Sequence, residues 1–120
     1  MTNIIEKKTK TIDNHTSEIL KVLSAGPRRK IIELLKDGEH CVCHMEAFLG
    51  YRQAYLSQQL KVLKDAGVIV DRREGWNVYY RVIDKRIFTL LESVYQYTGQ
   101  EMVEIKPYDL ACPCPKCNPT

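Results

Sequence analysis

Apolar residues recur every three or four positions along most of the chain, which predicts a largely helical fold. We expect a first helix to begin between Asp13 and Ser17, because these residue types favour helix N-caps. Its inward face would consist of Ile19, Leu20, Val22 and Leu23. Pro27 favours the first turn of a second helix, which we expect to end at Gly38.

Two shorter helices are predicted next, over residues 43–49 and 53–66, with a tight turn between them. The period of the pattern then changes from that of a helix to that of a strand. Residues 68–73 and 77–83 are rich in Val, Ile and Tyr, and a Gly-containing turn separates them. This part of the chain therefore predicts a β-hairpin.

A last helix is expected from Asp84 to Gly99, with an apolar stripe formed by Ile87, Leu90, Leu91, Val94 and Thr98. Two short helices joined by a tight turn and followed by a hairpin are typical of a winged helix-turn-helix. We therefore predict a mainly α (α+β) fold with about five helices and a two-stranded β-hairpin wing. Its domain would span residues 13–104, between a flexible N-terminal arm (1–12) and a Cys/Pro-rich tail (105–120).

The length of 120 residues suits one domain and excludes a multidomain enzyme. A net charge of +3 is too small to indicate nucleic acid, but the charge is unevenly placed. Residues 51–86 hold eight Lys or Arg against four Asp or Glu, whereas the rest of the chain sums to −1. This local excess favours a surface that contacts phosphate. No aliphatic run approaches the ~20 residues that span a bilayer and no signal peptide is apparent, so we expect a cytoplasmic protein without membrane contact.

The predicted helix over 53–66 has the two faces that a DNA-reading helix needs. Leu56, Leu60 and Leu63 form an apolar stripe, which leaves polar side chains outward. A solvated surface helix would look the same, but two arginines at the hairpin turn favour DNA because they would reach the minor groove or flanking phosphates. We expect contacts to double-stranded operator DNA from Arg52, Gln53, Ser57, Gln58, Lys61, Lys64, Arg72 and Arg73.

Five cysteines occur in two groups, one at Cys41 and Cys43 and one at Cys112, Cys114 and Cys117. An odd number without a secretion signal favours metal binding or thiol chemistry over disulfides. Residues i and i+2 of a helix point ~200° apart, so Cys41 and Cys43 would share an ion only if Cys41 lies outside the helix. The start of a helix also favours the thiolate that binds metal.

Two thiolates are too few for a tight site, so we expect the three tail cysteines to supply further ligands. The prolines among them would hold the tail extended and reduce the entropy lost on wrapping an ion. Trigonal sulfur suits As(III), Sb(III) or Pb(II), and tetrahedral sulfur or S3N suits Cd(II) or Zn(II). A separate site in the tail, or a reactive tail that binds no ion, is the alternative.

Three segments resemble the ArsR/SmtB family of metal-responsive repressors, over about residues 15–98. Tyr55–Ile69 and Arg72–Val82 look like the family's recognition helix and wing. Glu39–Met45 is similar to the E-L-C-V-C-D-L box that binds arsenic, antimony, lead or cadmium in several members. The resemblance implies a homodimer built on the first and last helices, which binds a palindromic operator and releases it when a ligand binds.

The chain departs from the family pattern at several positions. His40 and His44 replace the usual Leu and Asp of the box, and either would add a nitrogen ligand if it turned toward the ion. Gln59 stands where many members have His, and Trp76 where many have Arg, so operator preference does not carry over. The family's other zinc site uses Asp/His pairs on the last helix, and we expect it to be absent because residues 84–100 contain no His.

The leading hypothesis is a repressor that releases its operator when a thiophilic ion binds, without an organic cofactor. A thiol-based redox or persulfide-sensing repressor would use the same cysteines. A zinc-stabilised interaction module that does not bind DNA is the alternative outside this class. An enzyme is not expected, because no nucleophile, base and oxyanion donor occur together and the C-x-x-C at Cys114–Cys117 lacks a βαβ setting.

Overall fold

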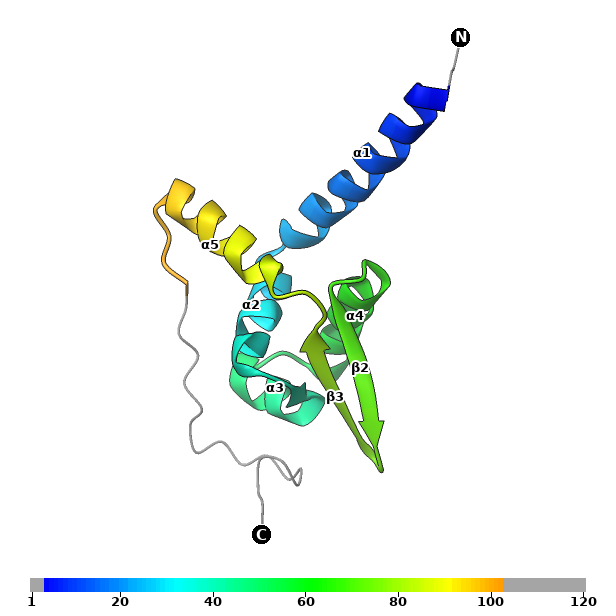
Figure 1. Cartoon of the computed structure of the whole chain (residues 1–120). Coiled ribbons are helices and arrows are strands. Elements are labelled where there is room, and N and C mark those ends of the chain that lie inside the picture. The colour runs from blue at the N-terminus through cyan, green and yellow to red at the C-terminus, as the bar shows by residue number, and fades with distance from the viewer. Residues whose placement is uncertain (1–3, 103–120) are drawn as a thin grey trace.

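The computed structural model describes the backbone of residues 4–102 and the side chains of residues 13–102. A short 3-10 turn, η1 (Leu35–Asp37), extends the second helix. Within the described part, the chain forms α1 (Ile4–Leu23), α2 (Gly26–Leu34), β1 (His40–Cys41), α3 (Val42–Leu49), α4 (Gln53–Asp65), β2 (Ile69–Glu74), β3 (Asn77–Val82) and α5 (Arg86–Thr98). This order confirms the predicted winged helix-turn-helix with five helices. In Figure 1, α1 and α5 lie at one end of the molecule and the turn of the β2–β3 hairpin at the other.

The first helix is longer than predicted. It begins at Ile4, so the expected start between Asp13 and Ser17 is wrong, and residues 4–12, which we expected in a flexible arm, are helical. This stretch contains Ile, Glu and Lys but neither Gly nor Pro, so nothing in it breaks a helix. The cap-type residues between Asp13 and Ser17 therefore lie in the interior of α1 and do not start it.

The other helix boundaries follow local signals within one or two residues. Gly50 ends α3 in the left-handed region with φ +69°, and its N–H donates to the carbonyl of Glu46 at 2.9 Å. The last helix begins at Arg86, two residues after the predicted Asp84. The Asp84 carboxylate still accepts the backbone N–H of Arg86 at 3.0 Å, so it serves the helix start from outside.

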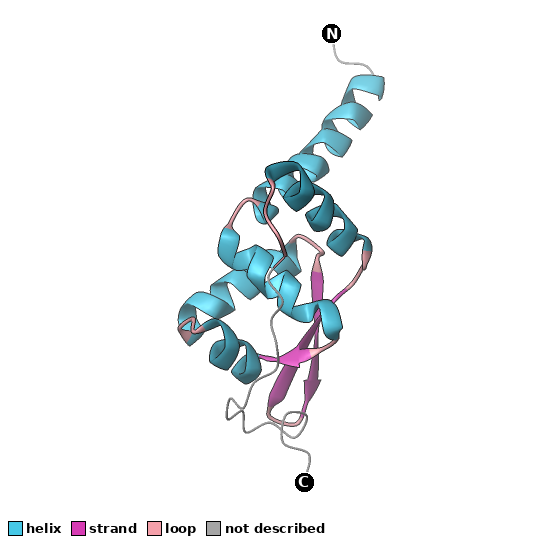
Figure 2. Ribbon diagram, turned by 90° about the vertical axis from the view of Figure 1, so that its left-hand side faces the viewer, coloured by secondary structure: helices cyan, strands magenta, loops and turns pink. Residues whose placement is uncertain are grey.

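The wing is part of a three-stranded antiparallel sheet in the order β1-β3-β2. Strands β2 and β3 pair from Ile69↔Val82 to Glu74↔Asn77. The predicted two-stranded sheet is incomplete, because β1 adds the pairs His40↔Tyr80 and Cys41↔Tyr79 on the other edge of β3. Strand β1 is too short to show an alternating sequence pattern. It forms only because it pairs with β3, which lies far away in the sequence. Figure 2 shows the strands gathered on one side of the helices.

The core lies where α2, α3, α4 and α5 meet. The predicted apolar stripe of α4 is confirmed, since Leu56, Leu60 and Leu63 are all buried. Side chains with less than 2% exposure hold the helices and the base of the hairpin together, and the large apolar ones are Ile31, Ile32, Met45, Leu56, Leu60, Leu63, Ile69 and Leu91. Burial of each contributes about 1.5–3 kcal/mol, so the core fixes the angle between α4 and the wing.

Candidate ion-sensing site and nucleic-acid interface

The outer face of α4 is polar and open to solvent. The residues predicted to read DNA from this helix (Gln53, Ser57, Gln58, Lys61 and Lys64) are all exposed, as is Arg52, which precedes the helix. Gln59 is different: it is buried at 9% exposure and its Oε1 accepts from Nη1 of Arg28 at 3.0 Å. The helix therefore presents one continuous polar surface, and Gln59 belongs to the side that packs against α2.

Ion pairs fix the position of the wing relative to α4 and to β1. Nζ of Lys64 lies 3.0 Å from Oδ1 of Asp71, which joins α4 to β2. The hydrogen bond from Lys64 holds the pKa of Asp71 below its usual value. This contact ties the wing to α4, so the two elements present their outer residues together.

Arg72 is exposed, but its guanidinium is engaged by groups of the same molecule. Its Nε and Nη2 donate to the carboxylate of Glu39 at 3.1 and 2.6 Å, and its Nη1 donates to Glu74 at 2.8 Å. The guanidinium also lies 4.9 Å from the centre of the Tyr79 ring. Hydrogen bonds to Glu39 and then Glu74 raise the pKa of Arg72 further above its usual value. Arg72 thus joins the wing to the segment before β1, although its side chain is exposed, as is that of Arg73.

The two cysteine thiols before the helix-turn-helix lie side by side. Cys41 is the N-cap of α3 with extended φ and ψ of −81° and 161°, as the sequence argument required. Its Sγ lies 2.7 Å from Sγ of Cys43 and accepts the backbone N–H of His44 at 3.3 Å. Neither cysteine is in a disulfide. Cys41 is 2% exposed and Cys43 half-buried, so an ion would approach from the Cys43 side.

The two histidines of this segment stack on each other. The ring centres of His40 and His44 are 4.5 Å apart, and His44 also contacts the ring of Phe48 at 4.4 Å. Burial lowers the pKa of His44, which favours the neutral ring. Among the described residues, no group of three or more His, Cys, Asp or Glu side chains is placed to hold a metal ion. Cys112, Cys114 and Cys117 lie outside the described residues, so the expected ligands from the tail stay a prediction.

A groove of about 420 Å³ connects the thiols to the DNA-reading surface. The thiols of Cys41 and Cys43 lie at one side, α4 contributes its first turn, and the wing contributes β3 and its turn. Six of the ten lining residues were not predicted as site residues. The only signal for Glu46 was its place one helical turn after Cys43. The residues missed are Val42, Glu46, Trp76, Asn77, Val78 and Tyr80.

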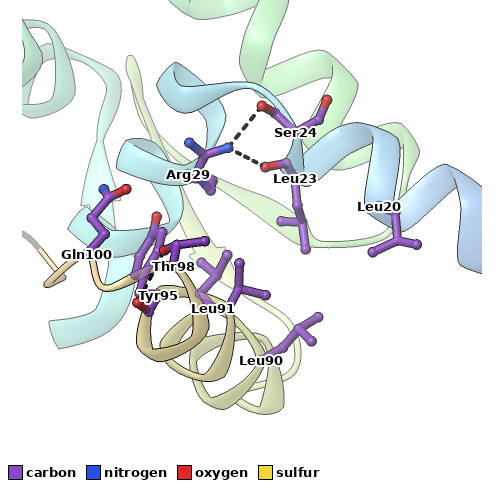
Figure 3. Close-up of a pocket in the computed structure, with 10 residues that line it drawn as sticks. Leu20, Leu23, Ser24, Arg29, Leu90, Leu91, Tyr95, Thr98 and Gln100 are labelled. Atoms are coloured by element: carbon purple, nitrogen blue, oxygen red, sulfur yellow. Dashed lines mark hydrogen bonds between the residues drawn. The ribbon is translucent and has the colours of Figure 1, made fainter.

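A second groove, of about 310 Å³, separates α1 from α5 at the far end of the molecule (Figure 3). Apolar side chains line it, and Arg29 closes one end by donating to the carbonyls of Leu23 and Ser24 at 2.7 and 2.9 Å. Leu20 was predicted to face inward, but it is 59% exposed, and Leu90 and Val94 are 40% and 44% exposed. The inward prediction for Leu20 is therefore wrong within the described residues, and of the predicted α5 stripe only Leu91 is buried.

None of the described helices combines the length and the apolar character needed to cross a membrane.

The chain is similar to known transcriptional regulators. A family model described as bacterial regulatory protein, arsR family, matches residues 26–70. The biofilm growth-associated repressor of Agrobacterium fabrum is 39% identical over 77 residues, which cover 64% of this chain and 66% of that protein. The chain thus spans just under two thirds of the length of that relative.

Two further proteins match over more of their length. The arsenical resistance operon repressor of Staphylococcus xylosus is 32% identical over 98 residues, which cover 82% of this chain and 86% of that protein. Mb0332 from Mycobacterium bovis, a homodimeric winged helix-turn-helix DNA-binding domain, superimposes with a TM-score of 0.70 at 28% identity. That match covers 87% of this chain and 100% of the solved domain.

Proposed function

Since the chain belongs to the ArsR family of bacterial regulatory proteins, we propose that it is a cytoplasmic, homodimeric repressor that senses a thiophilic ion. It binds double-stranded operator DNA and releases it when As(III), Sb(III), Cd(II), Pb(II) or Zn(II) binds the cysteine thiolates. The family and the fold are those of DNA-binding transcriptional regulators and not of enzymes. The arsenical resistance operon repressor among the relatives supports the choice of ion class.

The observation that carries this proposal is the thiol pair at the start of α3. The 2.7 Å between the two sulfurs places both within reach of one ion. Sulfur is a soft donor, so the pair selects thiophilic ions over Mg²⁺ or Ca²⁺. The N–H of His44 that points at Sγ of Cys41 stabilises a thiolate there, as does the N-terminus of the helix.

The ligand set is completed by the tail. Two sulfurs leave a trigonal or tetrahedral site one or two donors short. Cys112, Cys114 and Cys117 supply three more thiolates of the same chemistry, from the same protomer or from its partner. His40 and His44 adjoin the pair in the sequence, and either would add a nitrogen donor if its ring turned toward the ion and the tail supplied a single sulfur.

The homodimer would form through the exposed apolar stripe of α1 and α5. A twofold pair presents two copies of α4, and about one helical turn of DNA separates the half-sites that they read. Ion binding at Cys41 and Cys43 would displace the start of α3 and the strand paired with the wing, which moves the two α4 helices off this spacing. Coupling of this kind is typically about 1–3 kcal/mol, so ion binding should weaken DNA affinity about 5- to 150-fold.

The test is a fluorescence anisotropy titration of the dye-labelled DNA upstream of the gene, with each ion in turn. Wild type should bind with a steep salt dependence and be released by at least one ion. Cys41→Ser/Cys43→Ser should bind DNA equally well and lose the release. A second variant, Cys112→Ser/Cys114→Ser/Cys117→Ser, separates the tail from the pair. Normal ion sensitivity in the Cys41/Cys43 variant would show that the site is wrongly placed.

A thiol-based redox or persulfide sensor is the second candidate, and the 2.7 Å between the sulfurs favours it. Two adjacent thiols form a disulfide by giving two electrons and two protons to an oxidant such as a peroxide. Release of DNA by peroxide that dithiothreitol reverses, without any response to ions under reducing conditions, would support this candidate. A zinc-stabilised module without DNA affinity would instead show no salt-dependent binding at all.

A further inference from the structure

The wing ends in a large apolar side chain that is exposed to solvent. Trp76 occupies the turn between β2 and β3, and its relative exposure is 102%. Within the described residues, no aromatic stacking or cation-π contact involves this ring. In Figure 1 the hairpin extends beyond the helices and carries the turn at its free end. Removing this side chain would therefore open no cavity in the fold.

The backbone that carries the Trp76 side chain forms a tight, well-defined β-turn. Glu74 pairs with Asn77, so Gly75 and Trp76 form a two-residue loop. Gly75 has a φ of +60°, and no described residue other than glycine has a positive φ. This is the pattern of a type II′ turn, which matches the twist of the strands. Because β3, the strand that follows Trp76, also pairs with β1, it has a partner on both edges at Tyr79 and Tyr80.

Trp76 lies on the same side of the molecule as the DNA-reading residues. It lines the 420 Å³ groove together with Gln53 and Ser57 from the first turn of α4. The pair Lys64–Asp71 keeps the hairpin beside α4. A helix in the major groove would therefore place the wing tip across one phosphate strand, at the neighbouring minor groove.

On the basis of the proposed DNA binding, we propose that Trp76 enters the minor groove and packs against a base step. Apolar side chains that enter this groove partly unstack the bases and kink the duplex. The indole also has one N–H, which would donate to the acceptors on the floor of the groove. Arg73, three residues before Trp76 and exposed, would contact the adjacent phosphate. The wing would thus carry an apolar wedge and a charge side by side.

The chain contains a single tryptophan, so fluorescence excited at wavelengths that its seven tyrosines do not absorb reports on this side chain alone. The full-length protein, reduced and with EDTA present, is titrated with the dye-labelled duplex upstream of its gene. Anisotropy of the dye measures binding, and tryptophan emission with acrylamide measures contact at Trp76. We expect binding to quench the emission and to protect the ring from acrylamide. If DNA binds while the emission and the acrylamide access of Trp76 stay unchanged, the proposed groove contact of Trp76 is wrong and the proposed function stands. If the protein does not bind the DNA, both proposals are wrong.

Substitutions of Trp76 and Arg73 distinguish an apolar contact in the groove from a charge contact with a phosphate. Trp76→Ala should weaken DNA binding at least about fivefold, and Trp76→Phe should retain most of the affinity. Because the indole neutralises no phosphate, Trp76→Ala should leave the salt slope unchanged, whereas Arg73→Ala should reduce it by about one. Ile83→Ala is the control, since Ile83 is also apolar and is 52% exposed beyond the opposite end of β3. Equal affinity of Trp76→Ala and wild type, or a change in self-association alone, would refute the proposal.

Discussion

Removal of one buried hydroxyl tests how α5 is joined to the DNA-binding core. Oη of Tyr95 on α5 donates to Oε1 of Glu33 on α2 at 2.5 Å, and the two residues are 4% and 8% exposed. A hydrogen bond to a charged group contributes about 1.5–3 kcal/mol, and its loss leaves the buried carboxylate short of a partner. We expect Tyr95→Phe to lower the free energy of unfolding by this amount and the melting temperature by roughly 6–12 °C.

Urea unfolding followed by circular dichroism measures this difference. Both proteins are compared at one concentration, because the stability of the proposed dimer would depend on it. Tyr97→Phe is the matched control, since Tyr97 lies on the same helix and is 93% exposed. It should differ from wild type by less than about 0.5 kcal/mol. A Tyr95→Phe variant as stable as this control would mean that the hydrogen bond does not stabilise the fold.

The same pair predicts a pH dependence with a defined sign. Burial, followed by the hydrogen bond to Glu33, raises the pKa of Tyr95 above its usual value. Folding then favours the protonated phenol, so this contribution is fully present below about pH 10 and is lost as pH rises through the pKa of the folded state. Wild type should therefore lose more stability than Tyr95→Phe between pH 9 and pH 11. The difference between the two proteins removes the titration of the other tyrosines.

Three further substitutions test the surfaces described above. On the proposed dimer, Leu20→Glu should give a monomer in light scattering, because it puts a charge on the apolar groove, whereas Ile83→Glu should stay dimeric. Glu39→Gln should keep ion uptake but reduce ion-driven DNA release in anisotropy, because it removes the charge that holds Arg72. Lys61→Ala should lower the salt slope of DNA binding by about one if Lys61 contacts a phosphate, and an unchanged slope would exclude that contact.

Most of the fold follows from local pattern. The apolar period of α4 determines which side chains the core buries, so its outer face could be read from the sequence and is confirmed as exposed. The position of Cys41 outside α3 follows from helix geometry in the same way. The start of α1 could not be predicted, because cap-type residues at positions 13–17 are compatible with a helix interior as well as with its start.

Long-range contacts account for what the sequence did not show. Strand β1 is only two residues long and depends on β3, which lies almost 40 positions later in the chain. Arg72 appeared to be a DNA ligand at a turn, yet Glu39 and Glu74 compete for it. Leu20 shows a different limit of sequence-based prediction. A periodic apolar face looks the same in the sequence whether it packs within its own chain or, as in the proposed dimer, against a second copy.

The placement of β1 gives the thiol site a direct connection to the wing. Cys41 pairs with Tyr79 of β3 and packs against its ring, and Glu39 holds Arg72 above that ring from two residues upstream. Any displacement of the Cys41 backbone is therefore passed to β3 before it reaches α4. Because the ion pair between Lys64 and Asp71 joins α4 to β2, a shift of the wing would then be passed on to α4. On the proposed function, ion binding should thus disturb the minor-groove contact of the wing first and the major-groove contact of α4 second.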